Sequence, residues 1–208
     1  MSLSQESATL EADGPEAEAV DGRVLRGQRN REAIVDAMVA EYEKGNLRPT
    51  AAQVAQAAGL STRSVYHHFD DMTSLIYEVS ARTEQRIAEL DHDALDGAPL
   101  ADRVSAFVDH RMDRWSTTAA VVRAGLLAEY DSPVVAEILK HGREKRVSEI
   151  RSVFAEEIAA DDDGEALSAA LDVVFGFDTF HRLTVIRRLS AKRARATIEQ
   201  MALGVLTA

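Results

Sequence analysis

Apolar residues along this 208-residue chain recur every three or four positions, and no stretch alternates between apolar and polar residues as a strand would. This spacing is typical of amphipathic helices, so we expect an all-α fold. Pro99, Pro133 and the run from Asp161 to Gly164 mark helix boundaries. The predicted helices span 31–45, 51–57, 62–69, 72–90, 99–115, 117–129, 133–160, 165–189 and 191–206.

Residues 50–69 are the most informative stretch, because they predict two short helices joined by a tight turn. Thr50 and Gln53 have the spacing of a capping box, which begins the first helix. Gly59 can adopt the positive φ that ends it, and Ser61 is a good N-cap for the second helix. Two short helices joined by a glycine-containing turn are typical of a helix-turn-helix motif.

The second of these helices has a polar surface without acidic residues. Val65 and Phe69 lie four positions apart and are expected to pack inward, which leaves six hydrogen-bonding side chains elsewhere on the helix. A helix amino terminus also carries free N–H groups suited to phosphate. The pattern favours DNA binding, and an ordinary helical hairpin with a polar surface is the alternative. The six side chains are Thr62, Arg63, Ser64, Tyr66, His67 and His68.

Residues 31–90 resemble the amino-terminal domain of the TetR family of transcriptional regulators. The residues that carry the resemblance are Ala58-Gly59-Leu60-Ser61, Tyr66-His67-His68-Phe69, the cap residue Asp71 and the apolar Leu75. Met72 stands where the family usually has a lysine, which removes a common backbone contact. The resemblance implies a three-helix DNA-binding domain over 23–90, with its helix-turn-helix motif at 50–69. It also implies a carboxy-terminal helical ligand-binding and dimerisation domain over 91–208.

The resemblance implies roles for individual residues at the DNA. Thr50 would meet a phosphate, Tyr66 and His68 would contact the phosphate backbone, and His67 would touch a base or a thymine methyl group. Arg63 is the strongest candidate for reading sequence, because a guanidinium can bridge O6 and N7 of guanine. For Tyr66 the alternative is a half-buried packing role. The candidate DNA-binding residues are Thr50, Ser61, Thr62, Arg63, Ser64, Tyr66, His67 and His68.

The net charge of −11 looks unfavourable for binding DNA phosphates, but the charge is unevenly distributed. Residues 1–22 hold six acidic residues and no basic one, and we expect this tail to be disordered because it has almost no large apolar side chain. Residues 23–69 instead hold seven basic and four acidic residues. The arginines at the start of that segment are expected to form an arm that contacts DNA or, alternatively, a solvated lead-in to the first helix. They are Arg23, Arg26, Arg29 and Arg31.

Composition and motifs exclude several classes of protein. The chain has no cysteine, so it has no disulfide, thiolate metal site or thiol redox sensor. No apolar run approaches the length of a membrane span and no secretion signal is present, so we expect a cytoplasmic protein without a membrane partner. We find no nucleophile-elbow, P-loop or dinucleotide-binding pattern, so neither an enzyme nor a cofactor or metal site is expected.

The predicted helix over 165–189 is apolar on nearly every side, so it must be covered on every side. Its own domain can cover only part of it, and a second copy of the chain can cover the rest. The resemblance implies a homodimer through the last two helices, with a monomer core as the alternative. A two-fold dimer predicts a near-palindromic operator, with half-sites about 34–36 Å apart or a multiple of that distance.

The resemblance further implies that a small molecule binds among the carboxy-terminal helices and releases a repressor from its operator. The alternative is that this domain binds a protein partner. An apolar cavity with a few polar groups is typical of a ligand site. The candidate lining residues are Phe107, His110, Arg111, Trp115, Tyr130, His141, Phe177 and His181.

Overall fold

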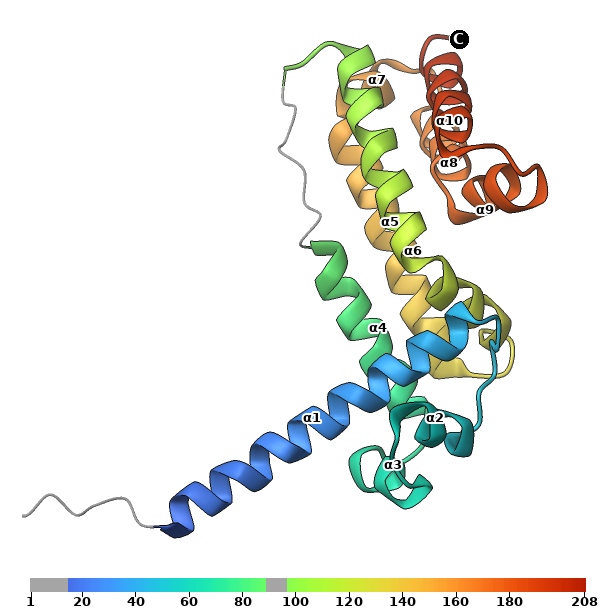
Figure 1. Cartoon of the computed structure of the whole chain (residues 1–208). Coiled ribbons are helices and arrows are strands. Elements are labelled where there is room, and N and C mark those ends of the chain that lie inside the picture. The colour runs from blue at the N-terminus through green and yellow to red at the C-terminus, as the bar shows by residue number, and fades with distance from the viewer. Residues whose placement is uncertain (1–14, 89–96) are drawn as a thin grey trace, which may run out of the picture.

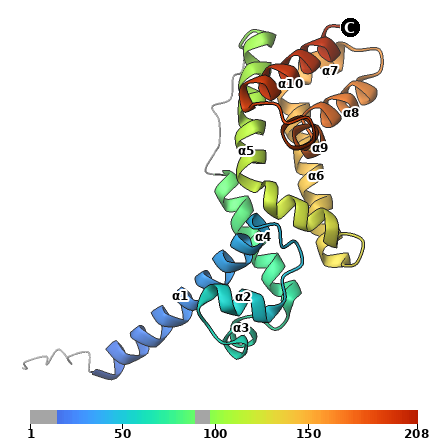
Figure 2. The same ribbon diagram turned by 45° about the vertical axis from the view of Figure 1, so that its right-hand side comes forward.

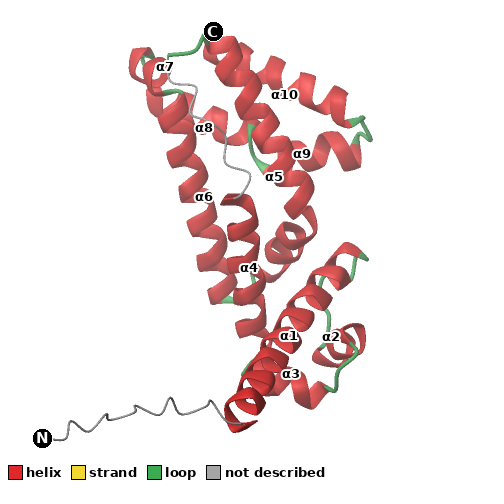
Figure 3. Cartoon of the chain, turned by 60° about the vertical axis from the view of Figure 1, so that its left-hand side comes forward, coloured by secondary structure: helices red, strands yellow, loops and turns green. Residues whose placement is uncertain are grey.

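The computed structural model describes residues 15–88 and 97–208, and all regular structure in these two ranges is helical (Figure 3). The predicted all-α fold class is confirmed. Within the same ranges, no helix is both long and apolar enough to cross a membrane. In chain order the helices are α1 (Pro15–Glu43), α2 (Ala51–Ala58), α3 (Thr62–His68), α4 (Met72–Ala88), α5 (Leu100–Ala128), α6 (Pro133–Val153), α7 (Ala155–Ala160), α8 (Gly164–Val174), α9 (Phe177–His181), the π-helical turn η1 (Arg182–Ile186) and α10 (Ala191–Leu206).

Helices α1 to α4 lie at one end of the molecule, and α7 to α10 lie at the other (Figure 1). The long helices α5 and α6 connect the two ends. The core of the α1–α4 end is built from apolar residues of all four helices together with Ala124 of α5, which is buried in the same cluster. The amino-terminal unit therefore shares its core with the rest of the chain.

A second core fills the far end, where α5, α6, α8 and α10 meet. Phe107 of α5 packs edge-on against Phe154 and Phe175, with ring centroids 5.5 and 4.7 Å away. Ile198 and Ala202 of α10 close this cluster. Large aromatic side chains dominate such a core because each buries a large apolar area.

Helix α5 is one continuous helix, whereas the sequence predicted two helices over 99–115 and 117–129. Ser116 and Thr118 lie at the expected break, but their hydroxyls donate to the carbonyls of Asp113 and Arg114 within the same helix, at 2.9 and 2.8 Å. This back-bonding leaves the helical ladder intact and often bends a helix. Helix α5 does change direction along its length (Figure 2).

The prediction of a single helix over 165–189 is also wrong. The structure divides this segment into three elements, α8, α9 and η1. The Trp115 Nε1–H donates to the Phe175 carbonyl at 3.0 Å, and the Thr179 hydroxyl donates to the Val173 carbonyl at 2.6 Å. These bonds satisfy carbonyls at the end of α8, so the chain can turn at Gly176. The predicted helix over 133–160 is likewise divided, at the buried Phe154.

Helix α1 begins at Pro15, whereas the sequence predicted a disordered tail through residue 22. Extending an existing helix costs much less than nucleating a new one, and proline suits a first helical position. The amino-terminal part of α1 projects away from the other helices (Figure 1). The rest of the predicted tail, residues 1–14, and the predicted linker at 91–96 lie outside the described residues.

Candidate nucleic-acid interface and interior cavity

The first helix of the predicted motif, α2, begins and ends as the sequence predicted. The Thr50 side chain accepts from the Gln53 N–H at 3.3 Å, and the Gln53 side chain accepts from the Thr50 N–H at 2.8 Å. Gly59 follows the helix at φ 68°, in the left-handed region that glycine adopts without strain. Its N–H donates back to α2, which directs the chain into the turn.

The second motif helix, α3, is fixed by Ser61, whose side chain accepts from the Ser64 N–H at 3.1 Å. Val65 and Phe69 are buried, as predicted. The opposite face carries four exposed polar side chains that have no hydrogen bond to other described residues. They are Thr62, Arg63, Tyr66 and His67.

The other four candidate DNA-binding residues have contacts within the protein. The Thr50 and Ser61 hydroxyls serve as helix caps, and the Ser61 and Ser64 hydroxyls are hydrogen bonded at 2.8 Å. His68 is half-buried, and burial followed by the charges of His67 and Arg31 lowers its pKa below the ordinary value. These four residues therefore stabilise the helix-turn-helix motif, in addition to any contact that they make outside the protein.

Arg31 was expected in a DNA-contacting arm, but it is an internal link. Its guanidinium donates to the His68 carbonyl at 2.8 Å and to Glu78 at 2.7 Å, and it lies 4.4 Å from the centre of the Phe69 ring. It therefore ties α1 to the end of α3 and to α4. Arg26 and Arg29 are exposed on the surface of α1, so these two cations lie on a helix and not on an extended arm.

A cavity of about 1110 Å³ lies between the amino-terminal helices and α5, α6 and α9. This volume is slightly larger than the range usual for small-molecule sites. Tyr42 of α1 and Ile76 of α4 line one side, and Leu126, Leu139 and Phe177 line another. A molecule bound here would touch the amino-terminal helices and the long helices at once.

The structure places three of the predicted ligand-binding residues on this cavity, namely Trp115, His141 and Phe177. Phe107 and Arg111 are buried beyond it, because Phe107 belongs to the second core and Arg111 binds Glu149. His110 and His181 do not line it either. His181 stacks on Phe177 at 5.7 Å, and Tyr130 is 93% exposed. Helical spacing predicted proximity along one helix, but the rotation of each helix against its neighbours decides which residues reach the cavity.

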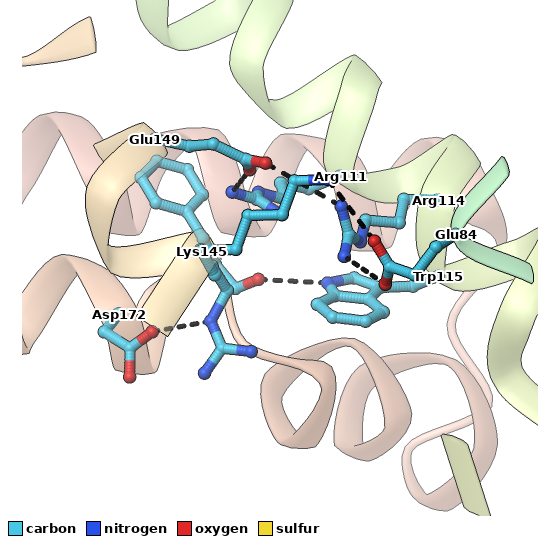
Figure 4. Close-up of polar contacts among 9 residues, drawn as sticks. Glu84, Arg111, Arg114, Trp115, Lys145, Glu149 and Asp172 are labelled. Atoms are coloured by element: carbon cyan, nitrogen blue, oxygen red, sulfur yellow. Dashed lines mark hydrogen bonds and ion pairs between the residues drawn. The ribbon is translucent and has the colours of Figure 1, made fainter. Parts of the chain in front are cut away.

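The cavity wall also carries charged residues that were not predicted from the sequence. Arg114, Arg146, Glu84 and Asp172 line it, and Figure 4 shows the cluster to which they belong. The missed signal is that Arg111 and Arg114 lie among the apolar residues of the α5 stripe, where a cation needs a specific partner.

Arg111 is the most deeply buried member of this cluster. Its guanidinium donates to Glu149 at 2.6 Å and lies 4.6 Å from the centre of the Phe107 ring. Burial lowers the pKa of Arg111 to about 10, although Glu149 acts in the opposite direction. A guanidinium with this pKa is still charged at neutral pH.

The fold is similar to that of several solved proteins. The sequence matches no protein-family model and no curated protein. A transcriptional regulator from Rhodococcus sp. Rha1 superposes with a TM-score of 0.68 at 16% identity, over 86% of this chain and 95% of that one. A protein from Mesorhizobium loti assigned to the TetR family gives 0.63 at 16% identity, over 87% and 96%.

A third structure, from Pseudomonas aeruginosa PAO1 and assigned as a transcriptional regulator, gives a TM-score of 0.64 at 19% identity, over 85% and 89% of the two chains. Identities this low establish a shared fold and carry no residue-level function. The TetR-type fold predicted from residues 31–90 is confirmed, and it extends over most of the chain.

Proposed function

We propose that this protein is a DNA-binding transcriptional regulator of the TetR type, which acts as a dimer and is released from DNA by a small molecule in the cavity. The observation that carries the proposal is the exposed, non-acidic face of α3. It follows a capped α2 and a left-handed Gly59, which is the geometry of a helix-turn-helix motif.

Four side chains on this face are available to DNA without breaking a bond inside the protein. Arg63 would read guanine, while Thr62 and His67 would meet neighbouring base edges. Tyr66 is exposed and would contact the phosphate backbone through its hydroxyl. The hydroxyls of Thr50, Ser61 and Ser64 already form hydrogen bonds that hold the two helices in place. A phosphate contact by any of the three would have to share its hydroxyl with that bond.

The shared core supports coupling between the cavity and α3. Ala124 of α5 is buried in the core of the amino-terminal unit, so a shift of α5 must repack that core. Arg48, two residues before the Thr50 cap, donates to Asp131 at 2.6 Å and to the Leu127 carbonyl at 3.1 Å. A ligand that moved the α5–α6 corner would therefore pull on the entry to α2.

The exposed apolar residues near the carboxy terminus support a homodimer. Ile186 of η1 is 60% exposed. Val185 and Met201 are also exposed. Exposed apolar residues on neighbouring elements are typical of a surface that another copy covers. This dimer would present two α3 helices to one near-palindromic site.

The cavity favours a small-molecule signal over a protein partner. The space is a large, mainly apolar pocket that reaches both halves of the chain, which suits a small molecule. The fold and the surface of α3 support a regulator and not an enzyme.

The proposal is tested by footprinting the full-length protein on the DNA upstream of its own gene. We expect protection of a near-palindromic site with two half-sites, and affinity that falls as salt is raised because phosphate contacts release counterions. Equal affinity for that DNA and for random DNA of the same length would reject the proposal.

A further inference from the structure

The opposite charges at the inner end of the cavity are unequally buried. Three arginines on α5 and α6 have side chains that are only 1% to 13% exposed, whereas the three carboxylates around them are 29% to 44% exposed. The carboxylates therefore keep more contact with water than the cations do, and the inner end is electropositive. The arginines are Arg111, Arg114 and Arg146, and the carboxylates are Glu84, Glu149 and Asp172.

Arg114 is incompletely paired within the described residues. Its terminal nitrogens lie 3.6 Å from Glu84 and 3.9 Å from Glu149, which is longer than a hydrogen bond. Its Nε is buried and has no hydrogen-bond partner among the described residues. Buried donors left in this state are costly, so a site that keeps them is expected to meet an acceptor from elsewhere.

Arg146 adds further donors at the same place. Its Nε donates to Asp172 at 2.5 Å, and among the described residues its two terminal nitrogens have no hydrogen-bond partner. Both guanidiniums lie near the ring of Trp115, at 5.6 Å for Arg114 and 6.0 Å for Arg146. Trp115, Arg114 and Arg146 all line the cavity, so the two guanidiniums lie at one end of it beside the indole ring.

The remaining arginines of the cavity wall are matched by partners. Arg143 donates to both oxygens of Glu129 at 2.7 Å, and Arg48 is paired with Asp131. The acidic lining residues Glu137 and Asp178 are exposed, so water screens them. Among the described arginines that line the cavity, the unmatched donors therefore belong to Arg114 and Arg146, whereas the unpaired Nε and Nη1 of Arg111 lie behind the wall.

We propose that the cavity binds an amphipathic anion, whose single negative group is held by Arg114 and Arg146 beside Trp115. This inference rests on the proposed function, because it names the chemical class of the signal that the cavity would receive. A carboxylate, sulfonate or phosphate monoester would supply the missing acceptors, and arginine binds such groups with paired hydrogen bonds.

The rest of the cavity suits an apolar body. Val122 and Leu126 of α5, Leu139 of α6 and Phe177 of α9 line it. An anion alone would leave this apolar surface in contact with water, and a neutral hydrocarbon would leave the arginine donors unpaired. The two features together select a molecule that has both parts.

The test uses two fluorescent probes that differ only by an anionic group, anilinonaphthalene sulfonate and its uncharged counterpart phenylnaphthylamine. Trp115 lines the cavity and is the only tryptophan of the chain, so energy transfer from it reports a probe bound in its neighbourhood. For Arg146→Gln in the full-length protein, we expect the affinity for the sulfonate to fall about tenfold, because a charge-assisted hydrogen bond is lost. The affinity for phenylnaphthylamine should stay within about twofold, which also shows that the variant is folded.

Asp172→Asn and Arg143→Gln are the matched controls. Asp172→Asn removes the competing carboxylate from Arg146 and is expected to tighten sulfonate binding, whereas a merely structural ion pair would make it behave like Arg146→Gln. Arg143→Gln removes a paired arginine from the same wall and is expected to leave both probes unchanged. If Arg146→Gln weakens both probes equally, or neither, the anion site is rejected.

Measuring DNA binding of the same proteins without a probe separates this inference from the proposed function. Intact operator binding together with sulfonate binding that ignores Arg146 would reject the anion site alone. Charge-selective probe binding without any sequence-selective DNA binding would reject the regulator and keep the anion site.

Discussion

Individual side chains of the motif divide into those that hold it together and those that face outward. Thr50, Gln53 and Ser61 form the caps, and Arg31 bridges three helices. Fewer side chains are free to contact DNA than the sequence predicted, because the hydroxyls of Thr50, Ser61 and Ser64 are already hydrogen bonded within the motif. Arg63 is the outward residue with the greatest capacity to discriminate between bases.

Arg63→Ala is expected to weaken binding to the specific site by about 1–3 kcal/mol and to change binding to random DNA much less. The reason is that a bidentate contact to guanine is lost while phosphate contacts remain. Fluorescence anisotropy with both DNAs at fixed salt measures this. Arg86→Ala removes an exposed arginine from α4 and serves as the charge-matched control. Equal losses on both DNAs would contradict the role of Arg63.

Glu157 provides a prediction about pH. Its hydrogen bond with Arg103 outweighs burial and lowers its pKa below the ordinary value of 4.5. A carboxyl with a lowered pKa stabilises the folded state above its unfolded pKa, and this contribution is lost as pH falls through the folded value. Glu157→Gln is therefore expected to reduce the free energy of unfolding by about 1–3 kcal/mol at neutral pH.

The difference between Glu157→Gln and the original protein should shrink on acidification, and urea denaturation at neutral and acidic pH measures it. Glu156→Gln is the control, because Glu156 is exposed and should change stability by less than about 0.5 kcal/mol. A Glu157→Gln effect that stays constant with pH would show that the ion pair is not its cause.

At the scale of elements, the boundary between α7 and α8 depends on a close approach of two backbone segments. A Cβ added at Gly164 would lie 2.3 Å from the Ile158 carbonyl oxygen, which no side chain can relieve. Gly142, inside α6, has nothing within 4 Å of the same position. A side chain at position 164 would therefore clash with the backbone, whereas position 142 has room for one, although both glycines lie in helices.

Gly164→Ala is expected to lower the free energy of unfolding by about 1–3 kcal/mol, because the backbone must shift. Gly142→Ala is expected to raise it by up to about 1 kcal/mol, because alanine is a better helix former. Thermal and urea denaturation of the two variants decide this. If Gly164→Ala leaves the free energy of unfolding unchanged, the close approach of α7 and α8 does not contribute to stability.

At the scale of the whole molecule, the amino-terminal unit and the cavity cannot be treated as independent parts. Ala124 completes the core around α1–α4, and the cavity is lined from both ends of the chain. A ligand can shift such a molecule only if it binds two arrangements with different affinity. The wall shared by Tyr42, Ile76 and Leu139 provides the surface on which that difference would arise.

Ile186→Glu is expected to convert a dimer into a monomer, because it places a charge in the proposed apolar interface. Sedimentation velocity measures the mass, and the same variant should bind a two-half-site operator more weakly. Tyr130→Glu is the control, because Tyr130 is an exposed large residue in the α5–α6 connection. A monomeric original protein would contradict the dimer.

The sequence by itself determined the features that depend on neighbouring residues. The capping box at Thr50, the left-handed Gly59 and the Ser61 cap are set within four residues, so their chemistry is readable without a fold. The all-α class followed in the same way, because helical periodicity is a local property.

Only the tertiary structure decided what depends on distant residues. The end of α8 relies on a hydrogen bond from Trp115, sixty positions earlier, and Arg31 is an internal link because α3 and α4 fold back onto α1. The cavity wall likewise combines residues whose meeting depends on how each helix is rotated. Arg114 and Arg146 could be read in the sequence only as two cations, because their shared electropositive site exists only after α5 and α6 pack together.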